Sequence, residues 1–167
     1  MTPASETTLP QRQLPSAKHR SSRNKNAPTP KPVVEMATLG VTCEQWFKNR
    51  NQTPFDFQRE TWQAMGAGRN GLLHAPTGTG KTLAFLLPLI QKLDPEIEHV
   101  QALILAPSRE LALQIEQVLK DMGTGLKTNA VYGGRPMTQD RLDLKQAPAI
   151  LIGTPGRVAD HLRKGSV

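Results

Sequence analysis

The stretch that decides the fold reads Ala75-Pro-Thr-Gly-Thr-Gly-Lys-Thr82. A short apolar run, residues 71–74, precedes it, and a helix-forming run, residues 82–87, follows it. This strand–loop–helix context is what a phosphate-binding loop requires, because glycines let backbone N–H groups approach a pyrophosphate closely. Lys81 stands at the start of the expected helix, where the helix dipole disfavours a cation unless an anion lies between them. A nucleoside triphosphate is the expected anion.

The whole loop is predicted to line a nucleotide site, with Lys81 at the β- and γ-phosphates and the Thr82 hydroxyl on Mg²⁺. Lys81 and Thr82 are therefore the candidate catalytic residues, Thr82 is the candidate metal ligand, and ATP and Mg²⁺ are the expected cofactors. An ordinary glycine-rich turn before a helix is the alternative interpretation. The first glycine of the general pattern is replaced by alanine, so that the predicted loop residues are Ala75, Pro76, Thr77, Gly78, Thr79, Gly80, Lys81 and Thr82.

Composition separates the first 32 residues from the rest of the 167-residue chain. They hold six of the 14 prolines and six Lys/Arg against one acidic residue, and so carry +5 of the formal net charge of +7. Residues 1–35 are therefore predicted to be a disordered basic tail, and residues 40–167 to be one domain. The tail is either a solvated leader or an arm that attracts nucleic acid. A transit peptide and an alternative start at Met36 are further possibilities.

Two absences in the sequence bear on location. There is no apolar stretch long enough to span a membrane, so no membrane partner is expected. Cys43 is the only cysteine, so no internal disulfide can form. A chain of this kind suits a reducing compartment, and the cytoplasm is the expected localisation.

Apolar periodicity and turn residues predict the order of the secondary structure. Helices are expected over about residues 42–49, 54–66, 81–93, 109–122, 137–146 and 155–164, and strands over residues 72–75, 100–106, 128–132 and 149–153. Because strands and helices alternate from residue 72 onward, an open parallel α/β sheet with flanking helices is indicated. The continuous apolar run 100–106 further indicates a strand that is covered on both faces.

Three more motifs follow the later strands in order. Pro107-Ser-Arg-Glu-Leu-Ala112 comes after the second predicted strand, Gly133-Gly134 after the third and Thr154-Pro-Gly-Arg157 after the fourth. Gln58 ends a further motif, Pro54-Phe-Asp-Phe-Gln58, ahead of the phosphate loop. With these motifs in this order, residues 40–167 resemble the first RecA-like domain of superfamily-2 helicases of the DEAD-box type, a P-loop fold.

The resemblance implies ATP-dependent unwinding of nucleic acid, RNA rather than DNA, with Gln58 recognising adenine. Its motifs fall at the carboxyl ends of the strands, where open α/β sheets bind ligands. Glycine backbone, helix N-termini and arginine suit phosphate oxygens and would hold one strand without reading its sequence. Plain alternatives are an exposed helix-start arginine, a glycine turn and a helix cap with proline at its first position. The implied nucleic-acid-binding residues are Pro107, Arg109, Gly133, Gly134, Thr154, Gly156 and Arg157.

The sequence departs from the family pattern around Gln58. Asn51 stands where an aromatic residue is usual, and Phe55 stands where a threonine is expected. The residue that would stack on adenine is therefore unassigned. The run Phe55-x-Phe-Gln-Arg-x-x-Trp62 is also similar to large helicase-related DNA helicases. Part of a DNA-repair helicase is accordingly the alternative to an RNA helicase.

Several family motifs do not occur in the sequence. There is no Asp-Glu-Ala-Asp-like acidic box, no Ser-Ala-Thr motif and no second RecA-like domain. The chain resembles a helicase truncated before the acidic box, with an incomplete sheet whose strands at residues 100–106 and 149–152 would lie open. The intact protein is expected to need a second RecA-like domain. The chain alone could instead be a non-catalytic module that binds ATP and nucleic acid, or an unrelated P-loop protein such as a small kinase.

Overall fold

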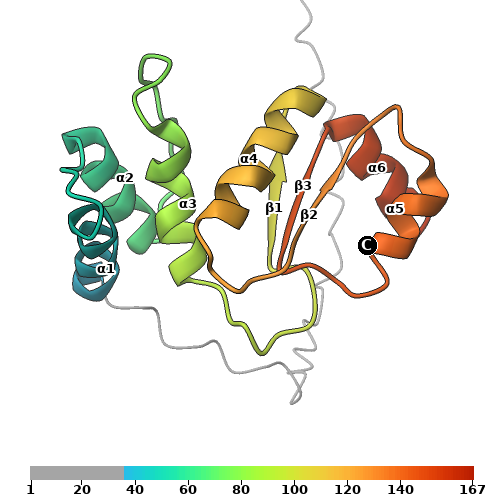
Figure 1. Cartoon of the computed structure of the whole chain (residues 1–167), viewed down its shortest axis with the longest axis horizontal. Coiled ribbons are helices and arrows are strands. Elements are labelled where there is room, and N and C mark those ends of the chain that lie inside the picture. Colours follow the sequence, from blue (N-terminus) through green and yellow to red (C-terminus); the bar gives the residue numbers. More distant parts are fainter. Residues whose placement is uncertain (1–35) are drawn as a thin grey trace, which may run out of the picture. The chain divides into compact units, whose positions relative to one another are not determined.

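The computed structural model describes the backbone of residues 36–167 and the side chains from residue 42 onward, and the predicted tail lies outside the described residues. The described chain begins with three helices and then alternates strands with helices (Figure 1). The elements are α1 (Met36–Lys48), α2 (Asp56–Gly66), α3 (Lys81–Gln91), β1 (Ala102–Leu105), α4 (Arg109–Asp121), β2 (Thr128–Val131), α5 (Met137–Asp143), β3 (Ile150–Gly153) and α6 (Pro155–Arg163).

The three strands form one parallel sheet in the order β1-β3-β2. The last strand of the chain therefore lies between the first two. Leu105 of β1 and Val131 of β2 are both aligned with Gly153 of β3, so that all three strands end at the same level. The predicted parallel α/β fold with flanking helices is thus confirmed.

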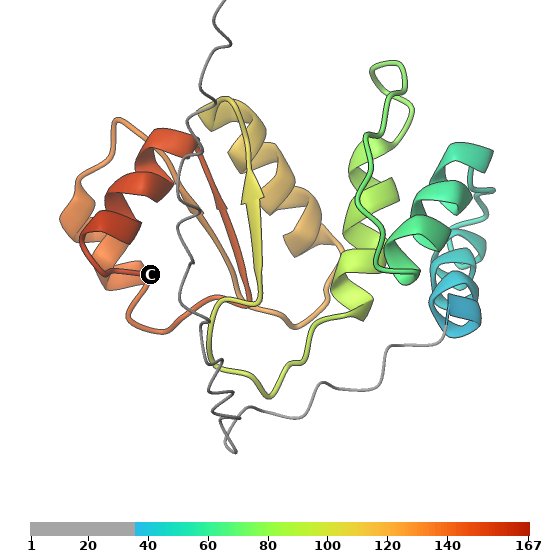
Figure 2. The ribbon, with the colours of Figure 1, turned by 180° about the vertical axis from the view of Figure 1, so that it is seen from behind.

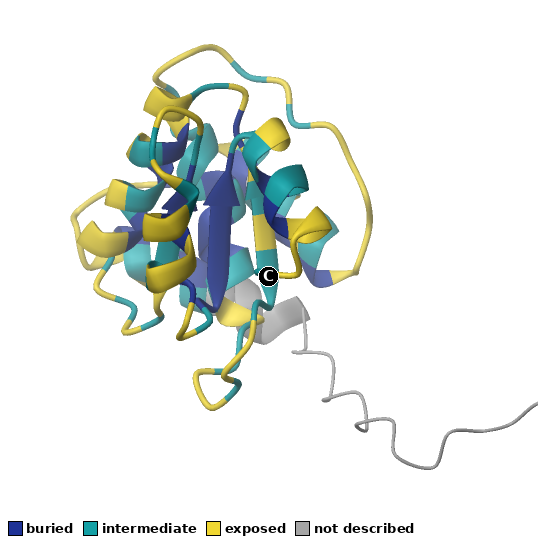
Figure 3. Cartoon of the chain, turned by 90° about the vertical axis from the view of Figure 1, so that its right-hand side faces the viewer, coloured by how far each residue is buried: buried dark blue, intermediate teal, exposed yellow. Residues whose placement is uncertain are grey.

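Helices cover the two faces of the sheet unequally. Ile150 and Ile152 point to one face and pack with Ile115 of α4 and Leu86 of α3. Leu151, between them in sequence, points to the other face and packs with Val158 of α6. This alternation is the period of two expected of a strand with both faces covered. Figure 3 shows the buried residues gathered along the sheet and the exposed residues on the outer sides of the helices.

A separate cluster joins α1, α2 and α3. It contains Cys43, Phe47, Trp62 and Leu87, and the ring centroids of Phe47 and Trp62 are 5.8 Å apart. Burial raises the pKa of the Cys43 thiol to about 12. The prediction that a helix starts at Thr42 is wrong, since α1 begins earlier. The capping-box residues Thr42 and Gln45 lie inside α1, so the pattern did not mark the start of this helix.

The predicted strand over residues 72–75 does not form. This segment has no regular secondary structure, and Leu72 is 94% exposed. A strand needs a neighbour to satisfy its backbone N–H and C=O groups, and none of the three described strands pairs with this segment. Its apolar composition was therefore not enough to make it a strand.

Two expectations about the other strands also fail. Strand β1 is not covered on both faces, because Ala102 and Ile104 pack on the core while Leu103 and Leu105 are 48% and 55% exposed. In Figure 2, α5 and α6 lie to one side of β1 rather than over it. Strand β3 does not lie open, since it pairs on both sides and is buried throughout. Of the two strands expected to be open, only β1 is.

Candidate functional site

The phosphate loop forms a compact turn that runs into α3. Gly78 and Gly80 have φ angles of +81° and +86°, which are left-handed conformations that side chains disfavour. The Thr79 hydroxyl donates to the carbonyl of Pro76 at 2.7 Å and closes the turn. Glycine is therefore required at both positions by the backbone itself, in agreement with the sequence motif.

Lys81 folds back over this loop. Its ammonium donates to the carbonyl of Pro76 at 2.7 Å and also to that of Ala75. The first backbone hydrogen bond into α3 is donated by Ala84 N–H to the Gly80 carbonyl at 3.1 Å. The N–H groups before Ala84 therefore have no acceptor within the helix. A cation and the positive end of a helix dipole thus lie together at one loop, and this arrangement is suited to an anion.

Gln58 lies directly against the phosphate loop, although it is 22 residues from Gly80 in sequence. Its side chain is 1% exposed, and its Nε2 donates to the Gly80 carbonyl at 3.1 Å. Its Oε1 accepts the Phe55 N–H at 2.8 Å. A Cβ atom at Gly80 would lie 2.9 Å from Gln58 Nε2, so a larger residue there would displace the Gln58 amide. The structure therefore brings together the residues predicted for adenine and for phosphate.

The two positions that depart from the family pattern lie in the turn before α2. Asn51 takes a φ of +53°, a conformation that asparagine tolerates better than most residues. The Phe55 ring is 59% exposed and stacks on Phe57, with centroids 5.8 Å apart. The residue that would stack on adenine remains unassigned.

The other predicted motifs meet at the carboxyl edge of the sheet. Because the strands end at one level, the loops after β1, β2 and β3 are neighbours. They contain residues 107–109, 133–134 and 154–157, and Figure 1 shows them at the same end of the molecule as the phosphate loop. The sequence prediction that these segments share one edge is thus matched by the strand register.

Each of the first two loops leads into a defined local structure. The Ser108 hydroxyl caps α4 by accepting the Leu111 N–H at 3.2 Å. Arg109 is exposed, and its guanidinium carbon lies 5.0 Å from the centre of the Tyr132 ring. Hydrogen bonds from its own N–H and from the Ser108 hydroxyl hold the pKa of Glu110 below its usual value. After β2, Gly134 has a φ of +86°.

The third loop differs, because its arginine is turned inward. Thr154 N–H donates to the Val131 carbonyl at 3.1 Å, which ties this loop to the end of β2. The Arg157 side chain is 11% exposed and donates from Nε to Asp140 at 2.7 Å. His161 is fully buried, with Nε2 3.1 Å from the same carboxylate oxygen. Sequence reasoning missed Asp140 and His161, because the contact that defines them joins separate helices.

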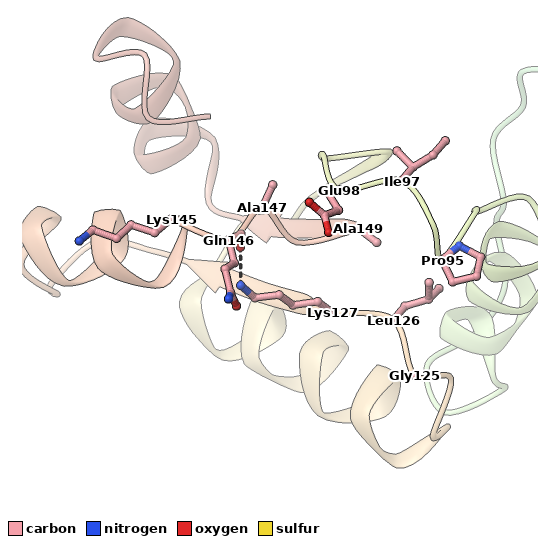
Figure 4. Close-up of a pocket in the computed structure, with 10 residues that line it drawn as sticks. All are labelled: Pro95, Ile97, Glu98, Gly125, Leu126, Lys127, Lys145, Gln146, Ala147 and Ala149. Carbon is pink, nitrogen blue, oxygen red and sulfur yellow. Dashed lines mark hydrogen bonds between the residues drawn. The ribbon is translucent and has the colours of Figure 1, made fainter. Parts of the chain in front are cut away.

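A hollow lies at the opposite, amino-terminal edge of the sheet (Figure 4). It has a volume of about 470 Å³ and is lined by segments near residues 95–98, 125–127 and 145–149. The Lys127 ammonium is already bonded to the Gln146 carbonyl, and the Lys145 side chain extends away from the other labelled residues. None of the predicted site residues lines this hollow, so it is not part of the candidate site.

Comparison with known proteins bears on this arrangement. The sequence profile of the DEAD/DEAH box helicase family matches residues 55–167. The chain is 41% identical over 122 residues to the probable ATP-dependent RNA helicase YfmL of Bacillus subtilis, covering 72% of this chain and 32% of that protein. It is 43% identical over 119 residues to the ATP-dependent RNA helicase DeaD of Escherichia coli K12, covering 70% of this chain and 19% of that protein.

Among solved structures, the chain resembles the helicase Lhr of Mycobacterium smegmatis, solved with single-stranded DNA and AMP-PNP. The TM-score is 0.67 at 28% identity, over 75% of this chain and 18% of that one. The chain thus spans about a fifth to a third of the length of the curated relatives named above. Among the described residues, no helix combines the length and apolar character needed to cross a membrane.

Proposed function

The chain belongs to the DEAD/DEAH box helicase family, and we propose that it is the ATP- and nucleic-acid-binding part of an enzyme that uses ATP to unwind RNA. One observation carries this proposal. The Gln58 amide, predicted to recognise adenine, is bonded to the Gly80 carbonyl of the phosphate loop. A base and a triphosphate could therefore be bound as one ligand. DeaD is named as an ATP-dependent RNA helicase and YfmL as a probable one.

In this proposal the loop residues bind the phosphates of ATP. Backbone N–H groups of residues 77–82 donate to phosphate oxygens, and Lys81 turns from the carbonyls of Ala75 and Pro76 to the β- and γ-phosphates. The Thr82 hydroxyl would hold Mg²⁺, which would supply charge neutralisation at the phosphates. To bind the adenine edge, the Gln58 amide would exchange its bonds to the Gly80 carbonyl and the Phe55 N–H for bonds to the base. These residues position the triphosphate, and positioning with charge stabilisation is most of phosphoryl-transfer catalysis.

The loops at the carboxyl edge of the sheet would hold the nucleic acid. Arg109 after β1, Gly133 and Gly134 after β2, and Thr154 and Gly156 after β3 offer backbone and side-chain donors to successive phosphates. Pro107 has no N–H to donate, so its part in the track is to contact the strand and shape the loop before α4. Such contacts do not read the bases. We therefore expect the affinity for nucleic acid to depend strongly on salt and weakly on base sequence. The part that Arg157 plays in this track is taken up in the next subsection.

Two alternatives to an RNA helicase are retained. A DNA helicase is favoured by the likeness to Lhr, whose structure contains single-stranded DNA. A module that binds ATP and nucleic acid without hydrolysis is the other alternative, and phosphate release distinguishes it from an enzyme. We further propose a domain boundary near residue 40, a disordered tail, a cytoplasmic location and a second RecA-like domain as the partner required for activity.

The nucleotide site is tested by Lys81→Ala, with Lys92→Ala at the other end of α3 as the matched control. Calorimetry with a non-hydrolysable ATP analogue should show at least tenfold weaker binding for Lys81→Ala, because a charge-assisted contact is lost. Lys92→Ala should bind like the wild type. Equal affinity of the wild type and Lys81→Ala would contradict the assignment of the loop.

The reaction and the polymer are tested together by steady-state phosphate release. Release stimulated by single-stranded RNA more than by single-stranded DNA supports an RNA-dependent enzyme. Stimulation by DNA alone favours the DNA-helicase alternative. Analogue binding with no release under either condition supports the non-catalytic module.

A further inference from the structure

A cluster of charged side chains lies beneath the loops that follow β2 and β3. We propose that Asp140 is a positioning residue for nucleic acid, and that Arg157 acts through Asp140 rather than by contacting a phosphate. The inference rests on the proposed function, because it says how two of the proposed nucleic-acid-binding loops are held in place.

The Asp140 carboxylate is fully buried and has three partners. Its Oδ2 lies 2.7 Å from Arg157 Nε and 3.1 Å from His161 Nε2, both on α6. Its Oδ1 lies 3.6 Å from Arg135 Nη1, in the loop after β2. A buried charge is tolerated only when it is paired, so each of these groups restrains the others.

Arg157 is committed to this cluster at two places on its guanidinium. Nε donates to Asp140, and Nη2 donates to the backbone carbonyl of Arg135. To reach a phosphate, the guanidinium would have to leave Asp140 buried and uncompensated, which is strongly unfavourable. The geometry therefore assigns Arg157 to the interior of the site and not to its binding surface.

The cluster lies directly behind the backbone that is proposed to meet the nucleic acid. Arg135 follows Gly134, and Arg157 lies three residues after Thr154. Arg135 also pairs with Asp143 of α5. The loop after β2 and the first turn of α6 are thus braced against the same carboxylate. Because these two segments are already held at a fixed spacing, less conformational entropy is lost when they bind nucleic acid.

Arg109 provides the natural contrast within the same sheet edge. It is exposed, and the contact described for it is with the Tyr132 ring rather than with a buried carboxylate. It can therefore turn to a phosphate without leaving a buried charge unpaired. The two arginines are predicted by the motifs to act alike, whereas the structure gives them different surroundings.

Salt dependence separates these two roles, because each phosphate contact on a single strand steepens the plot of log affinity against log salt by about 0.7. The measurement uses a fluorescent oligouridylate and this chain with an ATP analogue, at several salt concentrations. We expect Arg109→Ala to flatten the slope by about 0.7. We expect Arg157→Ala to leave the slope unchanged and weaken affinity about tenfold, the scale of one charge-assisted hydrogen bond.

Two further variants protect the test against simple misfolding. The double variant Asp140→Leu/Arg157→Leu replaces the buried pair with apolar side chains, a change that folds often tolerate. Its slope should equal that of the wild type. Asp140→Asn keeps an oxygen that can accept from Arg157, and it should weaken RNA binding while leaving affinity for the ATP analogue unchanged. These titrations are made at a temperature where thermal melts show every variant folded.

The outcomes distinguish this inference from the proposed function. A slope flattened by about 0.7 in the Arg157 variants would mean a direct phosphate contact and would overturn the positioning role. An Asp140→Asn protein that melts earlier but binds RNA normally would show a role in stability alone, which also overturns it. If the wild type binds neither RNA nor single-stranded DNA, the nucleic-acid part of the proposed function fails, and the inference fails with it.

Discussion

Residues 72–75 and residues 150–153 have similar apolar sequences but very different structures. Residues 150–153 form β3, which pairs with β1 on one side and β2 on the other, and its Ile150 and Ile152 are fully buried. Residues 72–75 pair with none of the described strands, and Leu72 is 94% exposed. Apolar composition suits a strand, but the strand itself exists only where a neighbour completes its hydrogen bonds.

The largest expected effect is on stability at the buried segment. Leu151→Ala should lower the free energy of unfolding by about 2–5 kcal/mol, because it leaves a cavity between the sheet and α6. Leu72→Ala, the same change in the unpaired segment, should alter it by less than about 0.5 kcal/mol. Urea titration followed by circular dichroism measures both. A comparable loss in the two variants would mean that residues 72–75 are buried in solution.

Glycine substitutions probe the same two segments without removing any side chain. A Cβ at Gly153 would lie 2.5 Å from Val158 Cγ2 and 2.8 Å from the Val131 carbonyl oxygen, so Gly153→Ala should destabilise by about 1–3 kcal/mol. Gly71 has no atom within 4 Å of that position, so Gly71→Ala should be close to neutral. Thermal melts of the two variants measure both changes in stability. If Gly153→Ala leaves the melting temperature unchanged, the close packing at the end of β3 is contradicted.

A third pair compares two helix starts at the sheet edge. Ser108 accepts the Leu111 N–H, whereas the Thr154 side chain makes no capping hydrogen bond. Ser108→Ala should therefore cost about 1 kcal/mol of stability, and Thr154→Ala only a few tenths. If Thr154→Ala costs as much as Ser108→Ala in the same urea titration, Thr154 serves the helix rather than a ligand.

The smallest effect concerns the packed helices beside the unpaired segment. The pKa of Cys43 is raised to about 12 by burial, so its thiol stays protonated and protected at pH 8. Alkylation by iodoacetamide should be slow in the native protein and fast in urea. Stability contributed by the buried thiol should be present below its ordinary pKa of 9.0 and fall as the pH rises toward 12. Fast alkylation of the native protein would show that the cluster of α1, α2 and α3 around Cys43 opens in solution.

The features that the sequence predicts well are those specified by a short motif or by residues close together along the chain. The glycine turn before α3, the Ser108 cap and the parallel order of the later strands follow from glycine conformation, capping chemistry and apolar alternation within a few residues. The fold class and the shared edge of three motifs follow from these elements. Each of these features is specified by residues that are neighbours in sequence.

What the sequence does not predict depends on partners that are distant along the chain. The segment at 72–75 failed as a strand because pairing is a property of two strands, and β3 was expected to be open although it inserts between β1 and β2. Asp140 and Arg157 are 17 residues apart, and neither apolar periodicity nor any motif pairs them. A buried charge cluster of this kind is found only when helices are placed beside each other.

Strand β1 has a consequence for how this chain behaves at high concentration. Within the described residues it pairs on one side only, and it presents Leu103 and Leu105 beside unpaired backbone groups. An uncovered strand edge of this kind can add a strand from another molecule. A lysine at Leu103 would act as a gatekeeper that opposes such pairing. We therefore expect any self-association of the chain through this strand to involve Leu103 and Leu105, which are distinct from every residue proposed to bind ATP or nucleic acid.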